Sequence, residues 1–124
     1  MNKVKVLLVD DEVEFVSALA ERLDIRDIEA RVATDGEQAL EMIETETFNV
    51  IVLDVIMPGI SGLEVLKRIN EKKIGTAVIL LTGHGSTKEG LEGMRMGAFD
   101  YLMKPLDIDE LISKMNEAIE SKKT

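Results

Sequence analysis

Short runs of apolar residues alternate along the chain with longer stretches in which apolar residues recur every three or four positions. The short runs have the length and the β-branched composition of strands. The longer stretches have the period of amphipathic helices. Strands are predicted over residues 4–9, 29–32, 50–53, 77–81 and 98–103. A helical stretch follows each of them, so the sequence predicts a strand–helix pair repeated five times.

This alternation predicts an α/β fold with a doubly wound parallel sheet of five strands and five helices, covered by helices on both faces. Several of the apolar runs are continuous, as expected for strands buried on both faces. Residues 29–32 alternate charged and apolar side chains instead, which favours an edge strand. No linker or repeat interrupts the pattern, so we expect residues 1–124 to form a single domain.

Four of the predicted helices begin with a capping residue that is followed, three positions later, by Glu or Gln. These pairs are Asp35 with Gln38, Ser61 with Glu64, Ser86 with Glu89, and Asp107 with Glu110. The helix after the fourth strand also contains Gly90 and Gly93. An interior glycine costs ~1 kcal/mol relative to alanine, so this helix is predicted to be the least stable.

Composition narrows the function classes. The 124 residues carry 15 Lys and Arg against 24 Asp and Glu, a net charge of -9, and 45% of them are hydrophobic. A chain of this size can bury a hydrophobic core, and its acidity argues against direct nucleic-acid binding. Cysteine is absent, which excludes disulfides, thiolate metal sites and a thiol nucleophile. His84 is the only histidine, so a multi-histidine metal site is excluded as well.

Membrane attachment is not expected. The longest uninterrupted aliphatic stretch, residues 77–81, is far shorter than the ~20 residues that cross a bilayer. The early apolar run ends at Asp10, before reaching the roughly 7–15 residues of a secretion signal. The sequence therefore predicts a cytoplasmic protein without a membrane partner.

Polar side chains follow the predicted strands at the points where these end. Asp10 and Asp11 follow the first strand, Asp54 the third, Thr82 the fourth and Lys104 the fifth. The carboxyl ends of parallel strands share one edge of the sheet, so these side chains converge. Three neighbouring carboxylates repel one another, and a hard cation such as Mg2+ relieves this. A carboxylate nucleophile, a hydroxyl donor and a lysine are the parts of a phosphoryl-transfer site.

Four motifs at these strand ends carry a family resemblance over essentially the whole chain. They are Leu8–Asp11, Asp54–Gly59, Leu81–Gly83 and Gly97–Pro105. Together and in this order they resemble the receiver domain of two-component response regulators, the fold of the single-domain chemotaxis regulator. The resemblance implies a flavodoxin-like sheet with strand order 2-1-3-4-5. It also implies a phosphorylation-activated signalling switch rather than an enzyme that acts on an external substrate.

The resemblance assigns a role to the acidic residues. Asp54 resembles the phospho-acceptor, and Asp10 and Asp11 resemble the acidic pair that binds Mg2+ together with it. The main-chain carbonyl of Ile56 is similar to a further metal ligand of the family.

The remaining motif residues resemble the switch. Thr82 resembles the hydroxyl that turns toward the phosphoryl group, Lys104 the lysine that pairs with it, and Tyr101 the aromatic residue whose rotamer follows. Pro105 resembles the proline after a cis peptide bond. Ile56 and His84 occupy the positions where family members differ and tune the lifetime of the phosphorylated state. Ile56 offers no polar group to orient water, so slow self-dephosphorylation is expected.

Partners follow from the same resemblance. His84 is badly placed to donate a phosphoryl group, so the donor is expected to be a phosphohistidine on a sensor histidine kinase or a histidine phosphotransfer protein. The family's output surface lies on the fourth helix, fifth strand and fifth helix, and it also serves for homodimers. An output partner or effector domain is expected there.

Three other interpretations account for part of the pattern. A haloacid-dehalogenase-type phosphatase also uses an aspartyl phosphate, but it predicts an Asp-x-Asp arrangement, and position 12 is Glu. A flavodoxin-type flavin carrier predicts a hydroxyl-rich loop where this chain has Asp10 and Asp11. A receiver fold that binds partners without phosphorylation is the third. Taken singly, each acidic residue also fits a helix cap or a turn.

Overall fold

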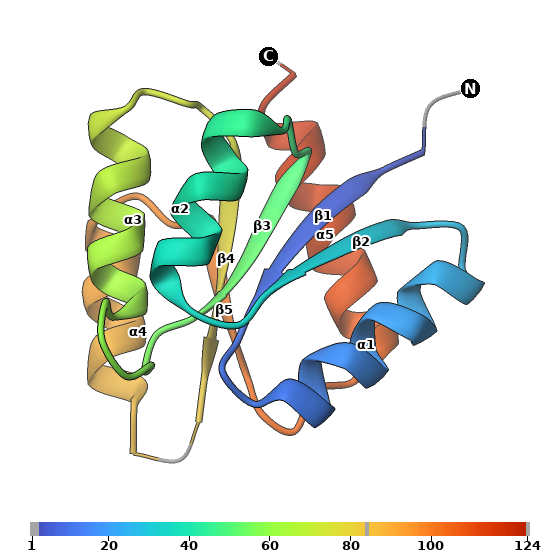
Figure 1. Ribbon diagram of the computed structural model, residues 1–124, viewed down its shortest axis with the longest axis horizontal. Helices are drawn as coiled ribbons and strands as arrows, with labels where there is room; N and C mark the ends of the chain where they lie inside the picture. Colours follow the sequence, from blue (N-terminus) through green and yellow to red (C-terminus); the bar gives the residue numbers. More distant parts are fainter. Residues whose placement is uncertain (1–2, 84, 124) are drawn as a thin grey trace.

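The computed structural model describes residues 3–83 and 85–123. Within them, strands and helices alternate strictly, as Figure 1 shows. The strands are β1 (Lys5–Val9), β2 (Glu29–Ala33), β3 (Val50–Asp54), β4 (Ala77–Thr82) and β5 (Asp100–Met103). The helices are α1 (Val13–Ile25), α2 (Gly36–Thr45), α3 (Gly62–Glu71), α4 (Thr87–Arg95) and α5 (Ile108–Ser121).

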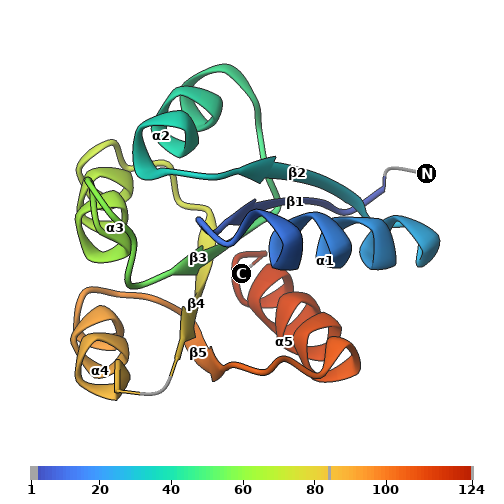
Figure 2. The same cartoon turned by 60° about the horizontal axis from the view of Figure 1, so that its bottom comes forward.

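The strands form one parallel sheet in the order β2-β1-β3-β4-β5. Helices α1 and α5 cover one face, and α2, α3 and α4 cover the other (Figure 2). The predicted α/β architecture and strand order are therefore confirmed. β1 and β3 are neighbours although a whole strand–helix unit separates them in sequence, which brings the ends of these two strands together.

The core lies in two layers, one on each face of the sheet. Because successive strand residues point to opposite faces, neighbours in one strand belong to different layers. Leu53 and Leu80 pack beneath α2, α3 and α4. Val52 and Leu81 pack beneath α1 and α5. The parity of a residue in its strand therefore decides which helices it meets.

Three strands end one residue later than predicted, and the first of them is β2, which ends at Ala33. Asp54 is the last residue of β3 and Thr82 the last of β4. Asp54 pairs with Leu81 across the two strands, and the Val55 N–H donates to the Leu81 carbonyl at 3.1 Å. The backbone ladder thus continues past the last apolar side chain. β5 is shorter than predicted and begins at Asp100.

Three of the four predicted helix caps are present. The side chains of Asp35, Ser61 and Asp107 accept hydrogen bonds from the first turns of α2, α3 and α5. The prediction for Ser86 is wrong, because its side chain makes no capping bond to α4. Its Oγ instead accepts from the Gly83 N–H at 2.7 Å and donates to the Gly83 carbonyl at 2.9 Å. That hydroxyl closes the loop before α4.

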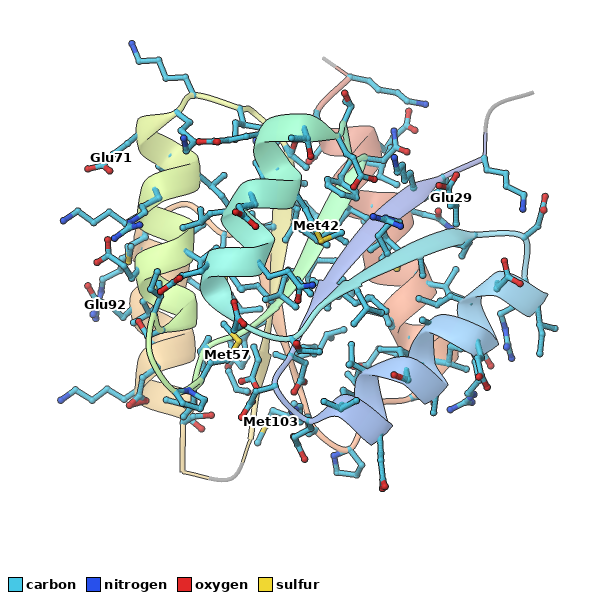
Figure 3. All side chains as sticks on the ribbon, viewed as in Figure 1. Glu29, Met42, Met57, Glu71, Glu92 and Met103 are labelled. Carbon is cyan, nitrogen blue, oxygen red and sulfur yellow. The ribbon has the colours of Figure 1, made fainter. Side chains whose placement is uncertain are left out.

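The two ends of the sheet differ in what surrounds them. Met57 and Met103 lie near the end where the strands finish, whereas Glu71 lies at the far end of α3 (Figure 3). Glu71 and Glu92 project outward from α3 and α4 in this view, so part of the acidic excess faces solvent. None of the helices within the described residues has the length and apolar composition needed to cross a membrane.

Candidate functional site

The carboxyl ends of the strands carry the predicted polar residues. Asp10 directly follows β1, Asp54 ends β3 and Thr82 ends β4, while Lys104 directly follows β5. Asp10, Asp54 and Thr82 are buried, with 0%, 6% and 0% of their surface exposed. Buried carboxylates need partners, so the contacts of these groups define the site.

Asp10 and Asp54 are held in the same way. Oδ1 of Asp10 accepts from the Glu12 N–H at 2.9 Å, and Oδ1 of Asp54 accepts from the Ile56 N–H at 3.0 Å. In both cases the donor lies two residues further along the chain, as in an Asx turn. The backbone thus fixes one oxygen of each carboxylate. The second oxygen, Oδ2, is left for other partners.

Lys104 provides the shared partner of these oxygens. Its Nζ lies 2.8 Å from Asp10 Oδ2 and 3.4 Å from Asp54 Oδ2. It also pairs with the carboxylate of Glu12. The Phe15 ring of α1 lies 4.8 Å from Nζ, within cation–π range. A single ammonium group therefore faces three carboxylates and one aromatic ring.

The electrostatics of the site depend on burial and on these charges. Burial raises the pKa of Asp54 above its ordinary value and the nearby charge of Asp10 adds to this, while the Ile56 N–H and Lys104 oppose it. Burial by itself lowers the pKa of Lys104, but the carboxylates of Asp10 and Glu12 outweigh it, so this pKa lies above the usual range. Lys104 is therefore a permanent cation at the site.

Three carboxylates come close enough to share a cation. Oxygens of Asp10, Glu12 and Asp54 lie within 4.8 Å of one another. Asp10 Oδ2 is buried and has no hydrogen bond of good geometry among the described residues, although the Lys104 ammonium is near it. A donor set made only of oxygen atoms, one of them buried and without a hydrogen bond of good geometry, fits a hard divalent cation such as Mg2+.

Asp11 differs from the other acidic residues. It is exposed and is not among the three clustered carboxylates, although it lines the cavity above them. Glu12, to which the sequence analysis gives no role, is in the cluster instead. The continuous acidic run from position 10 to 12 was the available signal. It did not distinguish the two side chains, because which of them reaches Lys104 depends on the chain path into α1.

An open cavity of about 310 Å³ lies over this cluster. Its lining residues are Asp11, Glu12, Asp54, Ile56, Gly83, Ser86 and Lys104. The buried Asp54 carboxylate can thus be reached from solvent through this cavity. The side chain of Ile56 is 53% exposed.

The predicted switch residues lie apart from this cluster. Thr82 Oγ1 is 3.5 Å from the Leu102 carbonyl and makes no hydrogen bond to Asp54 or Lys104 within the described residues. Tyr101 is half-buried and packs against the layer of α2, α3 and α4. The Lys104–Pro105 peptide bond is cis. His84 lies outside the described residues.

Sequence and structure comparisons agree on the family. The sequence model of the response regulator receiver domain matches residues 6–116. The chain therefore belongs to the receiver-domain family of two-component response regulators.

A sequence relative and a solved structure both support this assignment. The transcriptional regulatory protein CpxR of Escherichia coli (strain K12) is 40% identical over 111 residues, which are 90% of this chain and 47% of CpxR. The receiver domain of the Francisella response regulator 1452 is 37% identical and superposes with a TM-score of 0.88, covering 96% of this chain and 98% of that one.

A more distant structure shows the same fold. The CheY-like receiver domain protein of Methanospirillum hungatei is 26% identical, with a TM-score of 0.91 and 98% of both chains covered. The chain spans about half the length of the curated relatives it matches.

Proposed function

We propose that this chain, residues 1–124, is a phosphorylation-activated signalling switch in which Asp54 accepts a phosphoryl group. The observation that carries the proposal is the convergence of Asp54 with Asp10 and Lys104, because Asp54 and Lys104 also line an open cavity. The donor is a phosphohistidine on a sensor histidine kinase or a histidine phosphotransfer protein. The chain then catalyses only its own phosphorylation and slow dephosphorylation.

Transfer requires a carboxylate that is ionised and correctly oriented. The Ile56 N–H holds Oδ1 of Asp54, so the carboxylate meets the phosphorus in a fixed orientation. As the new oxygen–phosphorus bond forms, the bond from phosphorus to the donor imidazole nitrogen breaks. That nitrogen keeps the electron pair, and the ring leaves as neutral imidazole because its other nitrogen already carries a proton. Lys104 supplies positive charge next to the transferring group.

The residues that would hold Mg2+ are Asp10, Asp11, Asp54 and the main-chain carbonyl of Ile56, with the carboxylate of Glu12 beside them. When bound, this cation neutralises charge on the phosphoryl oxygens.

In this proposal, Thr82 and Tyr101 change conformation in response to phosphorylation of Asp54. The Thr82 hydroxyl leaves the neighbourhood of the Leu102 carbonyl and donates to the phosphoryl group on Asp54. Tyr101 then repacks against α4. The change reaches α4, β5 and α5, where an output partner, an effector domain or a second copy of the chain binds. Because the chemistry uses a kinase, we place the protein in the cytoplasm.

Ile56 and His84 tune how long the phosphoryl group stays. The exposed Ile56 side chain stands beside the cavity and offers no hydrogen-bonding group to an attacking water. Ile56→Asn is expected to speed phosphate loss several-fold, roughly the effect of one additional hydrogen bond to the attacking water. An unchanged rate of loss, followed by intact-protein mass, would contradict this role.

The decisive test is intact-protein mass spectrometry after incubation with acetyl phosphate and Mg2+. The wild-type chain is expected to gain one phosphoryl adduct. Asp54→Asn, which keeps the shape of the side chain but not its nucleophile, is expected to gain none. Asp107→Asn, at the cap of α5, is the control and should be phosphorylated normally.

Two outcomes would overturn the proposal. If the wild type gains no adduct, the receiver fold acts here as a phosphorylation-independent binding module. If Asp54→Asn still gains the adduct, the acceptor lies elsewhere.

A further inference from the structure

Gly90 of α4 lies directly over Thr82. A Cβ atom placed on Gly90 would be 2.7 Å from Cγ2 of Thr82, closer than real Cβ atoms approach another carbon, and 3.6 Å from two atoms of the Tyr101 ring. Gly90 and Thr82 are both buried. The Thr82 methyl group therefore occupies a space that exists only because residue 90 has no side chain.

The position of this methyl group also determines the position of the Thr82 hydroxyl. Cγ2 and Oγ1 of threonine are attached to the same carbon and rotate together about one torsion. The hydroxyl is 3.5 Å from the Leu102 carbonyl, which is the outer limit for a hydrogen bond. The space over Gly90 is thus a condition for this rotamer, which the long hydrogen bond by itself holds only weakly.

We propose that Gly90 is a positioning residue for the switch hydroxyl. By leaving room for the Thr82 methyl group, it permits the rotamer in which the hydroxyl faces Leu102 in the unphosphorylated protein. This inference rests on the proposed function, in which the same hydroxyl turns to the phosphoryl group on Asp54. A side chain at position 90 is expected to release the hydroxyl before any phosphoryl group is present.

The staggered rotamers of threonine give the direction of this effect. In the present rotamer the methyl group faces Gly90 and the hydroxyl faces Leu102. Of the two other staggered rotamers, one places the hydroxyl against residue 90 and the other places only a hydrogen atom there. The second relieves the contact completely, and it moves the hydroxyl away from the Leu102 carbonyl.

Gly93 provides a matched control on the same helix. It is also buried, and its added Cβ would lie 2.1 Å from Cδ1 of Leu80. Gly93→Ala therefore crowds a core leucine instead of the switch residue. Both substitutions carry the same gain in helix propensity. An effect that comes from a more stable α4 would appear in both variants.

The experiment compares wild type, Gly90→Ala, Thr82→Ser, the double variant and Gly93→Ala. Three-bond couplings to the Thr82 methyl carbon, measured by NMR on unphosphorylated protein, report the rotamer directly. The rate of adduct formation with acetyl phosphate and Mg2+ reports the switch. Gly90→Ala is expected to change the couplings and to raise the rate roughly fivefold, the size of a modest coupling between two states.

The Thr82→Ser background makes the test specific. Serine keeps the hydroxyl but lacks the methyl group that meets residue 90. Adding Gly90→Ala to Thr82→Ser is therefore expected to change the rate of phosphorylation less than twofold. If Gly90→Ala alone fails to fold, the double variant is expected to fold, because the crowding atom is gone.

Several results would overturn the inference. One is a set of Thr82 couplings in Gly90→Ala that equals the wild-type set. Another is a change in the rate of phosphorylation that is equal when Gly90→Ala is added to wild type and to Thr82→Ser, or a rate increase of the same size in Gly93→Ala. The last is a double variant that does not fold. If no variant gains an adduct, the proposed function has failed, and the couplings still test the Gly90 contact by themselves.

Discussion

The two faces of the sheet carry different side chains at the carboxyl ends of the strands. Asp10, Asp54 and Lys104 have the strand parity of the layer beneath α1 and α5, and the Phe15 ring of α1 lies over the Lys104 ammonium. Thr82 has the opposite parity and meets α4. The charged side chains therefore belong to the face covered by α1 and α5, and Thr82 belongs to the face covered by α2, α3 and α4.

The two groups also differ in what holds them. Backbone N–H groups fix the carboxylates of Asp10 and Asp54, whereas the rotamer of Thr82 depends on the space that Gly90 leaves open. Those N–H groups belong to Glu12 and Ile56, in the turns that directly follow β1 and β3. Moving them requires the backbone to move, whereas a side chain can change rotamer by itself. In the proposed function, this difference suits the charged face to phosphoryl transfer in a fixed geometry. It suits the other face to a change of the Thr82 rotamer.

Two glycines test this contrast, and the first should give the largest effect. A Cβ on Gly62 would lie 2.0 Å from the Asp54 carbonyl oxygen, which is backbone. Gly62→Ala is expected to lower the free energy of unfolding by about 3 kcal/mol, the upper range for overpacking. Gly90→Ala, which meets a side chain that can rotate, is expected to lower it by less than about 1 kcal/mol.

Urea denaturation measures both values. Gly59→Ala serves as the control, because nothing lies within 4 Å of its added Cβ and only its positive φ of 75° opposes the change. Equal losses for Gly62→Ala and Gly90→Ala would contradict the proposed difference between a glycine that meets backbone and one that meets a side chain.

Removing the cation of the charged face is the next largest change. Lys104→Met leaves the buried carboxylates of Asp10 and Asp54 without a counter-charge. We expect a loss of about 2 kcal/mol, below the ~3–5 kcal/mol of a fully buried pair, because the Lys104 side chain is 18% exposed. Added Mg2+ should restore part of the loss.

Lys114→Met is the matched control, since Lys114 pairs with Asp100 at 3.0 Å on a more exposed part of the surface. Its cost is expected to stay below about 1 kcal/mol. If the two variants lose the same stability, or if Mg2+ has no effect on Lys104→Met, the charged cluster is not what stabilises this end of the sheet.

Asp54→Asn is expected to stabilise the protein at neutral pH. Burial raises the pKa of Asp54 in the folded state, so the folded protein holds this proton more tightly than the unfolded chain. Stability contributed by the group is present at low pH and is lost as the pH rises through its raised pKa. Asp54→Asn lacks this loss and should gain on the order of 1 kcal/mol at pH 7.

Denaturation curves measured at several pH values test this sign. The difference between Asp54→Asn and wild type is expected to shrink as the pH falls toward the ordinary carboxyl pKa of about 3.9. A difference that stays constant with pH would mean that packing, not ionisation, separates the two proteins.

Phe15 should give the smallest effect. Phe15→Leu keeps an apolar side chain but removes the ring 4.8 Å from Lys104 Nζ. The loss is expected to be about 0.5 kcal/mol, typical of a partly exposed cation–π contact. In a double-mutant cycle with Lys104→Met the effect of Phe15→Leu should become smaller, and full additivity would exclude the contact as its cause.

Much of the fold could be predicted because its determinants are local or periodic. The apolar runs of β1, β3 and β4 predict buried strands, and the mixed run of β2 predicts the edge strand that the sheet contains. The meeting of the strand ends followed from the parallel arrangement alone. The convergence of Asp10, Asp54 and Lys104 therefore needed no side-chain detail.

The remainder depends on contacts that sequence spacing does not encode. Glu12 reaches Lys104, which is 92 residues away, because the chain turns into α1 at that point. Gly90 was interpreted only as a residue that weakens a helix, yet its neighbour is Thr82 on another element. Such roles come from tertiary packing, which periodicity does not report.

The separation by strand parity has a consequence for protein engineering. Reaction rate and signal strength in one small domain are usually hard to adjust one at a time. Under the proposed function, substitutions facing α1 and α5 address the charged groups of the site, while substitutions facing α4 address the Thr82 hydroxyl. One library of variants could therefore change the lifetime of the phosphorylated state, and another could change the conformational response. Variants from the two libraries could then be combined.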